Sequence, residues 1–506
     1  MKVHLLYNDR DPNTDTVSTD QVDGLTADLI RDLGLGTVLD HMSDGDRLLR
    51  SIATRTMLTP LRHPEEVRYR QQVFADCLQH PGLIAGLYQL ATEALDSPRR
   101  ARGWMLGNDP PAVLHRATEV LAMLLTHLRA LRALADEYAL SCGAAGLQAL
   151  FAGIHRELPD SYFPLVEEHL RRLEFPTGVI MTATLGPGCH GTGYVLRKPA
   201  TIKRDWRAVL LGGASSPGYT YRIAERDQAG AQALGELRNQ GINLVADAVA
   251  QSVDHIMGFF TQLRWEAGFY LGCAHLHQTL GGRGIPVCQP DPRPAEERVL
   301  SGRGVRDVVL ALRADSVVGN DLDADGATLI MITGANQGGK STLLRSLGLA
   351  QLMLGAGMFV AADSYRASLA TGLYTHYTRE EDAGMDSGKF DEELARMSRI
   401  VDRLSAGSMV LLNESFASTN DREGSQVARH IVEGLRGAGV RVLYVTHLFD
   451  LAHGLARTGA QDAVFLRPER LPDQQRTYRV VPGEPLPTSY GPDLYQRVFG
   501  SGQPAA

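Results

Sequence analysis

Cysteine is scarce in this sequence, and long apolar runs are absent. The 506 residues include five cysteines, which lie far apart and form no Cys-x-x-Cys pair. Neither a zinc site nor a disulfide framework is therefore expected, and a reducing compartment such as the cytoplasm fits this composition. No apolar stretch reaches the roughly 18 residues of a membrane-spanning helix, and the first residues lack the apolar core of a signal peptide. We expect a cytoplasmic protein without membrane contact.

An excess of positive charge is also missing. The formal net charge is −7, and 44% of the residues are hydrophobic, as in ordinary globular proteins. Bulk electrostatics therefore do not favour nucleic acid, and any such binding needs a local basic patch. The length allows several domains, each with a core of its own.

The first half of the chain has the periodicity of helices. Apolar residues recur at helical spacing within about 25–172, and helices return over about 225–280. The run from Leu244 to Leu280 contains no proline and predicts one long helix. Between these helical parts, glycine, threonine and β-branched residues dominate about 177–224, which predicts a small β-rich insert.

Strands and helices alternate after about residue 300. Residues 328–332 form a continuous apolar run with the length of a buried strand, and residues 343–354 follow with helical spacing. Residues 409–412 and 440–445 predict two further strands with an amphipathic helix between them. Buried strands that alternate with helices predict an α/β domain with a mainly parallel sheet.

The segment between the first of these strands and its helix matches G-x-x-x-x-G-K-[ST], the pattern of a phosphate-binding loop. Glycines let several backbone N–H groups face one phosphate, and the following helix adds its positive N-terminal end. Lys340 would place its charge on the β- and γ-phosphates, and the Ser341 hydroxyl would bind Mg²⁺. The alternative is a glycine-rich turn without nucleotide, which the flanking strand and helix disfavour. The residues predicted to bind ATP here are Gly334, Ala335, Asn336, Gln337, Gly338, Gly339, Lys340, Ser341 and Thr342.

Polar residues also follow the next two strands. Asn413 and Glu414 come after residues 409–412, where nucleotide hydrolases carry an acid near Mg²⁺ and a carboxylate near the attacking water. Glu414 is the predicted base. Asn413 stands where an Asp usually helps to hold Mg²⁺, so metal affinity and turnover are expected to be low. His447 ends the following strand, where an imidazole can bond the γ-phosphate or the water. The alternative, ordinary loop residues at strand ends, is disfavoured by the phosphate loop beside them. We assign catalysis to Lys340, Glu414 and His447, and the metal to Ser341 and Asn413.

Longer motifs surround these residues. Residues 333–342 are similar to TGPNMGGKST, and residues 412–424 align without gaps with MDEIGRGTSTYDG. Shorter matches lie at 318–321 (VPND), 387–393 (a shortened SGRSTFMVE), 445–451 (ATHYFEL), and 478–483 with 489–491 (YKVxPG…SYG). With these motifs the chain resembles the MutS family of DNA mismatch-repair ATPases.

The resemblance implies an architecture and a set of partners. The expected fold is an α/β P-loop ATPase domain of the ABC type at the C-terminus, preceded by a mostly α-helical core and lever region with a small β-rich insert. Asn320 would approach the nucleotide, and Asn420 would reach the γ-phosphate of a partner subunit. ATP and Mg²⁺ are the implied cofactors, and a homodimer through the ATPase domain is the implied assembly. The implied domains are an N-terminal helical core segment (1–95), helical lever arms with a clamp-like insert at about 177–224 (96–298), and the ATPase domain (299–506).

The sequence departs from that family in its signature loop, where residues 416–421 replace GRGTST. The resembling segments include no counterpart of the N-terminal mismatch-recognition domain, of the helix-turn-helix that reinforces dimers, or of the Smr nuclease domain. The resemblance therefore predicts the ATP switch and not mismatch recognition.

The β-rich insert is the candidate DNA contact. Basic side chains lie there beside Tyr194 and Trp206, and they can neutralise phosphates while an aromatic ring packs on sugar or base. The alternative is the solvated surface of a small domain. The residues predicted to contact DNA are Arg197, Lys198, Lys203, Arg204 and Arg207.

Two functions from different classes fit the sequence. The first is an ATP-gated clamp on double-stranded DNA, branched or damaged forms included, in mismatch repair or a related repair or recombination process. The second is a nucleotide-switched scaffold for a protein or RNA assembly, with slow hydrolysis and no DNA specificity. Asn413, the altered signature loop and the acidic total charge favour the second. Salt-dependent DNA binding would distinguish the two functions.

Overall fold

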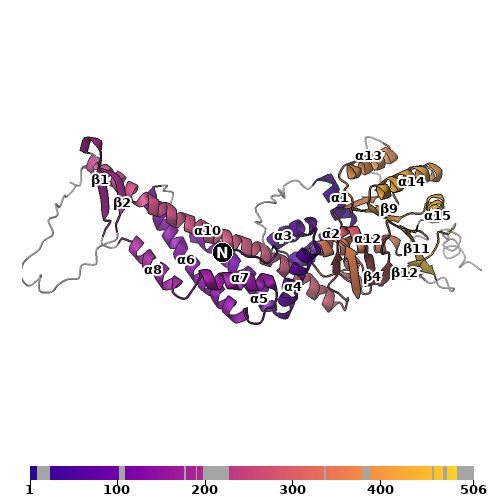
Figure 1. Ribbon diagram of the computed structural model, residues 1–506, viewed down its shortest axis with the longest axis horizontal. Coiled ribbons are helices and arrows are strands. Elements are labelled where there is room, and N and C mark those ends of the chain that lie inside the picture. The colour runs from indigo at the N-terminus through magenta and orange to yellow at the C-terminus, as the bar shows by residue number, and fades with distance from the viewer. Residues whose placement is uncertain are drawn as a thin grey trace, which may run out of the picture. The chain divides into compact units, whose positions relative to one another are not determined.

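The described part of the chain forms two compact units, each considered by itself. The first unit contains residues 1–3, 86–140 and 150–264, and the second contains residues 4–85, 141–149 and 265–506 (Figure 1). No helix among the described residues is long and apolar enough to cross a membrane. The computed structural model describes residues 1–7, 23–101, 109–175, 178–189, 191–197, 227–334, 338–379, 388–458, 461–470 and 476–486.

The first unit is built from long helices and one strand pair. Leu114 of α6 packs with Ile242 and Ala246 of α10 in a small apolar core. The single long helix predicted from the sequence is confirmed, and α10 continues beyond the predicted range at both ends. The elements of this unit are residues 86–101 of α5 (Pro81–Ala101), α6 (Pro110–Tyr138), residues 150–157 of α7 (Ala145–Glu157), α8 (Tyr162–Leu173), β1 (Met181–Leu185), the 3-10 turn η3 (Pro187–Cys189), β2 (Gly191–Leu196) and residues 228–264 of α10 (Gln228–Gly282).

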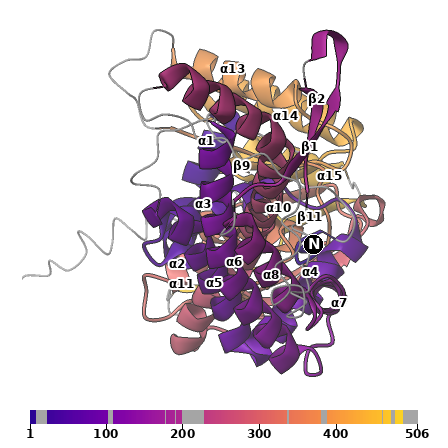
Figure 2. The same ribbon diagram turned by 90° about the vertical axis from the view of Figure 1, so that its left-hand side faces the viewer.

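The strand pair lies within the predicted β-rich insert. Strands β1 and β2 are antiparallel, with Met181 opposite Leu196, and both views show them as one paired ribbon (Figures 1 and 2). Thr184 and Thr192 lie opposite each other, and the hydroxyl of each donates to the backbone carbonyl of the other. β-Structure is therefore confirmed at the start of the insert, while residues 198–226 lie outside the described part of the chain.

The second unit combines N-terminal helices with two sheets. Pro64 occupies the first turn of α4, where proline needs no N–H partner. Its N-terminal helices are α1 (Gly24–Asp32), α2 (Leu35–Ser43), α3 (Arg47–Leu58) and α4 (Pro64–Gln79), followed by the first residues of α5 and α7 and the end of α10. The later elements are β3 (Asp291–Arg293), η4 (Ala295–Glu297), β4 (Leu300–Val305), α11 (Val308–Ala311), β5 (Asn320–Asp323), β6 (Leu329–Ile332), α12 (Lys340–Gly355), β7 (Ser364–Ser368), β8 (Leu373–Tyr377), α13 (Lys389–Val401), β9 (Met409–Asn413), α14 (Asp421–Gly437), β10 (Arg441–Val445), α15 (Phe449–Arg457), β11 (Ala463–Arg470) and β12 (Arg476–Pro482).

The larger sheet has the strand order β12-β11-β6-β10-β9-β8. All neighbours are parallel except β11 and β12, so the mainly parallel sheet predicted from the sequence is confirmed. Alternate residues such as Leu329 and Met331 face a core that α13, α14 and α15 complete. On the opposite face, Gly348 of α12 lies against Leu411. Burial on both faces explains why these strands are continuous apolar runs.

The smaller sheet was not predicted from the sequence. Its order is β3-β7-β4-β5, with one parallel and two antiparallel pairs. Its strands are short and carry glycines and charged residues, as in Leu300–Val305 and Asn320–Asp323. Such segments have little β-propensity of their own, and the tertiary context determines their structure.

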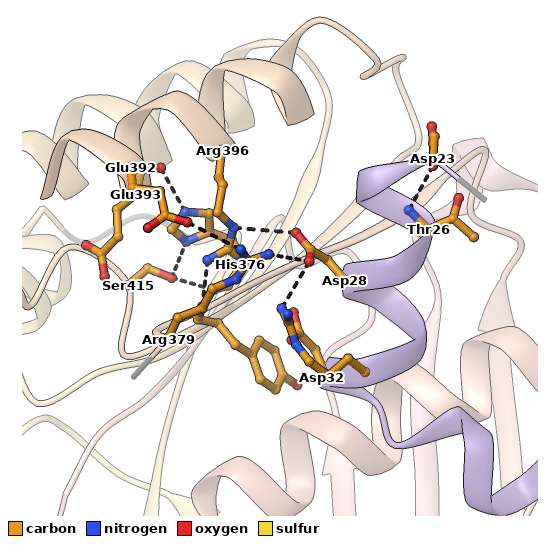
Figure 3. A network of polar contacts seen from close by, with 12 residues as sticks. Asp23, Thr26, Asp28, Asp32, His376, Arg379, Glu392, Glu393, Arg396 and Ser415 are labelled. Carbon is orange, nitrogen blue, oxygen red and sulfur yellow. Dashed lines mark hydrogen bonds and ion pairs between the residues drawn. The ribbon is translucent and has the colours of Figure 1, made fainter. Parts of the chain in front are cut away.

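Helix α1 is fixed to β8 and α13 by a buried ionic network (Figure 3). Asp28 is 6% exposed, and its carboxylate accepts hydrogen bonds from Arg31 at 3.0 Å and from Arg379. The Arg396 guanidinium, on α13, lies 3.5 Å from the second Asp28 oxygen and is 1% exposed. Arg396 also donates to the Tyr377 carbonyl at 3.0 Å. Asp28 thus contacts three guanidinium groups, and Asp32 and Glu392 supply further carboxylates to Arg31 and Arg379.

We expect Asp28→Ala to lower the free energy of unfolding by about 3–5 kcal/mol, because it removes the carboxylate that is ion-paired with the buried Arg396 guanidinium. The matched control is Asp23→Ala on the same helix, which removes an exposed N-cap that accepts from the Thr26 N–H. That loss should cost about 1 kcal/mol. Urea denaturation followed by far-UV circular dichroism measures both. Equal losses for the two variants would contradict the role given to Asp28.

Candidate nucleotide site

The predicted phosphate loop joins β6 to α12. Gly334 has φ 120° and Gly339 has φ 90°, conformations that L side chains rarely adopt. A Cβ on Gly334 would lie 2.9 Å from Pro468 Cδ, and one on Gly339 would lie 3.0 Å from the Tyr478 carbonyl oxygen. Glycine is therefore required at both positions for conformation and for space. Gly338 directly precedes the N-cap of α12, and Thr342 lies in its first turn. Ala335, Asn336 and Gln337 lie outside the described residues.

Lys340 begins α12 and is 4% exposed. Its ammonium donates to the Gly334 carbonyl and lies 3.9 Å from Glu414 Oε1. Burial lowers the pKa of Lys340, and the nearby Glu414 carboxylate opposes that shift. A buried cation at the N-terminus of a 16-residue helix provides strong attraction for a phosphate group.

Ser341 and Asn413, the two residues predicted to hold the metal, are in contact. The Ser341 hydroxyl donates to Asn413 Oδ1 at 2.8 Å. A hydroxyl and an amide oxygen are hard oxygen donors, which suit Mg²⁺ when phosphate and water complete its shell. The pair fits the ion in chemistry, although it contributes no negative charge.

Glu414 and His447, which follow the neighbouring strands β9 and β10, form a second contact at the site. Glu414 Oε2 accepts from His447 Nδ1 at 2.7 Å and from the His447 backbone N–H at 3.1 Å. The Glu414 carboxylate that accepts this bond raises the pKa of His447, against the opposing effect of burial. The carboxylate, 25% exposed, thus lies between the Lys340 ammonium and the imidazole.

The two asparagines implied by the family resemblance have other contacts. Asn320 on β5 is buried, and its Oδ1 accepts from the Val480 N–H of β12 at 2.7 Å. Asn420 is the N-cap of α14 and accepts from the Glu423 N–H at 2.9 Å. Its side-chain amide also donates to the Glu423 carboxylate at 2.9 Å, where a capping box would use the backbone N–H. Their nucleotide contacts stay predictions.

The predicted DNA contacts lie mostly beyond the described residues. Arg197 follows β2, is exposed, and its Nε donates to Thr182 Oγ1 at 2.9 Å. Lys198, Lys203, Arg204 and Arg207 are outside the described part of the chain, and so is Trp206.

Sequence reasoning missed the residues that shape this edge from neighbouring strands. Thr378 donates its hydroxyl hydrogen to the Glu414 carbonyl. Tyr478 on β12 has φ 58°, is 52% exposed, and places its carbonyl beside Gly339. The family motif at 478–483 includes Tyr478 but does not predict its contact with Gly339, and no local pattern marks Thr378.

We expect Glu414→Gln to lower the pKa of His447 toward the ordinary imidazole value of about 6.5. Asp421→Asn, which removes a weaker electrostatic contribution to the same shift, should lower it less. Nuclear magnetic resonance titration of the imidazole measures both shifts. Because the folded pKa is raised, the pair stabilises the fold fully below the unfolded pKa, and this stabilisation is lost as pH rises through the folded pKa. An unchanged His447 pKa in Glu414→Gln would refute the assigned cause.

Comparisons with known proteins agree with this picture. Residues 62–283 match the family described as MutS2 N-terminal domain, and residues 330–494 match MutS domain V. The chain is 32% identical over 200 residues to Endonuclease MutS2 of Carboxydothermus hydrogenoformans, covering 38% of this chain and 25% of that protein. It is 32% identical over 166 residues to DNA mismatch repair protein MutS of Chloroflexus aurantiacus, covering 32% of this chain and 17% of that protein. The match thus spans a quarter or less of each relative's own length. The two family matches lie in both the helical and the α/β parts, and the chain belongs to the MutS family.

Proposed function

We propose that this protein is an ATP-gated, ATP-hydrolysing DNA clamp of the MutS kind that acts in DNA repair or recombination. Residues 299–506 would form its ABC-type P-loop ATPase domain, residues 96–298 its lever arms and clamp, and residues 1–95 its helical core segment. Two ATPase domains would close head to tail around nucleotide and change the grip on double-stranded DNA.

The observation that carries this proposal is the meeting of five predicted residues at one sheet edge. Strands β6, β9 and β10 are parallel neighbours, so their carboxyl ends lie together, where α/β proteins bind ligands. The loop after β6 leads to Lys340 and Ser341. Strand β9 ends at Asn413 and is followed by Glu414, and β10 leads to His447. The contacts of 2.7–3.9 Å among them connect a phosphate-binding group, a metal-binding pair and a base.

Each side chain has a distinct part in hydrolysis. Lys340 would exchange its contacts with Gly334 and Glu414 for the β- and γ-phosphate oxygens, and its charge would stabilise the transition state. Lys340 departs from Glu414 in that exchange, which leaves the carboxylate available to accept a proton from the attacking water. His447, held by Glu414, would donate a hydrogen bond to the γ-phosphate or to that water.

Mg²⁺ would be held by the Ser341 hydroxyl together with phosphate oxygens, with Asn413 Oδ1 accepting from a metal-bound water. The ion supplies positive charge that stabilises the phosphoryl oxygens in the transition state. Asn413 orients this shell without adding negative charge, so this chain would hold the ion more weakly than one with an Asp there.

The remaining contacts follow from the family. Asn320 would approach the nucleotide, and Asn420 would donate its amide to the γ-phosphate bound by the partner subunit after leaving Glu423. The clamp would grip DNA phosphates through Arg197, Lys198, Lys203, Arg204 and Arg207 without reading bases. The named relatives supply the DNA-repair context: one bears the name of a mismatch-repair protein and another that of an endonuclease.

A second candidate is a nucleotide-switched scaffold for a protein or RNA assembly. The Asn413 amide in the metal-binding pair favours it, because a weakly held ion would make hydrolysis slow. This candidate shares the nucleotide site and differs in having no affinity for DNA.

We expect Asn413→Asp to reduce the Mg²⁺ concentration needed for half-maximal hydrolysis by up to about tenfold. The reason is that the new carboxylate adds negative charge to the groups around the metal. The matched control is Gln251→Glu at an exposed position of α10, which adds the same charge in the first unit. Steady-state ATP hydrolysis across a Mg²⁺ titration measures both. An unchanged requirement in Asn413→Asp would remove the weak-metal argument.

A binding panel tests the proposed function itself. The wild type should bind homoduplex, mismatched or branched DNA, with affinity falling steeply as salt rises because phosphate contacts release counterions. ATP should change that affinity in the wild type and not in Lys340→Ala. Glu414→Gln should still respond to ATP while hydrolysing it about 10²–10⁴-fold more slowly. If no DNA form binds with or without nucleotide, the clamp proposal fails and the scaffold remains.

A further inference from the structure

The turn that follows Glu414 is held in a backbone conformation that its sequence does not favour. Glu414 has φ 54° and Phe416 has φ 65°, although neither is glycine. Non-glycine residues adopt this region rarely, and such conformations persist only where the surroundings enforce them. The direction in which the Glu414 carboxylate points therefore depends on the groups that hold this turn.

A carboxylate on α13 provides the main restraint on the far side of the turn. Glu393 is 3% exposed, and its Oε2 accepts from the Phe416 backbone N–H at 2.9 Å and from the Ser418 hydroxyl at 2.9 Å. Burial raises the pKa of Glu393, while the two hydrogen bonds oppose that shift. Six residues lie between Glu414 and α14, and this one Glu393 oxygen bonds to two of them, Phe416 and Ser418.

His376 on β8 supports the same turn from beside Glu393. Its ring stacks on Phe416 with centroids 5.2 Å apart, and its Nε2 lies 3.0 Å from the Glu393 carbonyl oxygen. Burial and the neighbouring Arg396 lower the pKa of His376 to about 4, so the neutral ring carries its proton on Nε2 and donates it to that carbonyl. Nδ1 lies 2.8 Å from the Ser415 hydroxyl, which donates to the His376 backbone carbonyl. Glu393 therefore contributes both its backbone and its side chain to the support of the turn. Figure 3 shows His376 between Glu393 and Ser415.

Helix α13 is itself fixed, so Glu393 cannot simply follow the turn if the turn relaxes. Arg396, one helical turn after Glu393, is buried and bonded to the Tyr377 carbonyl and ion-paired with Asp28. Arg379 joins Asp28 to Glu392 on the same helix, at 3.3 Å from the Glu392 oxygen. The restraint on the turn is thus anchored in the folded core rather than in another loop.

We propose that Glu393 is a positioning residue for ATP hydrolysis, whose carboxylate holds the strained turn after β9 so that Glu414 points at the attacking water. This inference rests on the proposed ATPase function and extends it to a residue outside the nucleotide-contacting set. Glu393 acts through the Phe416 and Ser418 bonds, and it affects the chemical step more than nucleotide binding, which depends on the loop before α12.

The test compares substitutions on α13 in the full chain. Glu393→Ala removes the acceptor and should lower kcat about 10- to 100-fold, since small displacements of a catalytic group have effects of this size. Its Kd for Mg²⁺–ATP should stay within about threefold of the wild type, because α12 and its loop are unchanged. Glu393→Gln retains one oxygen that can accept from both donors, and it should recover most of kcat. Asp391→Ala, an exposed acid on the same helix, should match the wild type.

Ser418→Ala supplies an independent check should Glu393→Ala fold poorly. It removes one of the two donors to Glu393 Oε2 and should lower kcat by a smaller factor, with the Kd unchanged. A folded Glu393→Ala with wild-type kcat, or with kcat and Kd changed in proportion, overturns the inference while leaving the ATPase proposal standing. A wild type that does not hydrolyse ATP overturns the proposed function and this inference together.

Discussion

The buried ammonium of Lys340 is the group on which the rest of this site depends. A cation this deeply buried requires nearby oxygens, and those of Gly334 and Glu414 are among them in this structure. The same two contacts link the phosphate loop to the end of β9, so the charge that would receive a triphosphate also orders the catalytic edge. In the proposed function, an arriving phosphate would replace these oxygens with its own charged oxygens, and that exchange would couple nucleotide binding to the release of Glu414.

The sheet makes this coupling possible. Parallel strands end at a common edge, so residues more than a hundred positions apart in the chain, such as Lys340 and His447, share the neighbour Glu414. Behind that edge, Glu393 contacts His376 and the turn after Glu414, and Arg396 on the same helix α13 is paired with Asp28 on the N-terminal helix α1. The nucleotide site is therefore connected within the second unit to a segment at the opposite end of the sequence.

The sequence was informative where function depends on short local patterns. The long helix α10, the apolar strands β6, β9 and β10, and the pairing of Ser341 with Asn413 were all predictable, because each follows from periodicity or from position at a strand end. The contacts of Asn420 with Glu423, which form a helix cap, could have been predicted from their spacing but were not.

Other features had no local signal. The smaller sheet consists of short, charged segments whose strand structure comes from tertiary pairing. The left-handed backbone at Glu414 and Phe416 depends on contacts with other segments, such as the Glu393 carboxylate. The ion pair of Arg379 with Asp28 joins residues 351 positions apart. The DNA-contact prediction rests on residues that lie mainly outside the described part of the chain, so it depends on charge and family alone.

Isothermal titration calorimetry of Mg²⁺–ATP into the full chain tests the central claim most directly. The account predicts one saturable nucleotide site per chain in the wild type, with binding lost when the Lys340 ammonium is removed and retained when only the Glu414 charge is removed. Absence of saturable heat in the wild type, or equal binding after loss of Lys340, would contradict it.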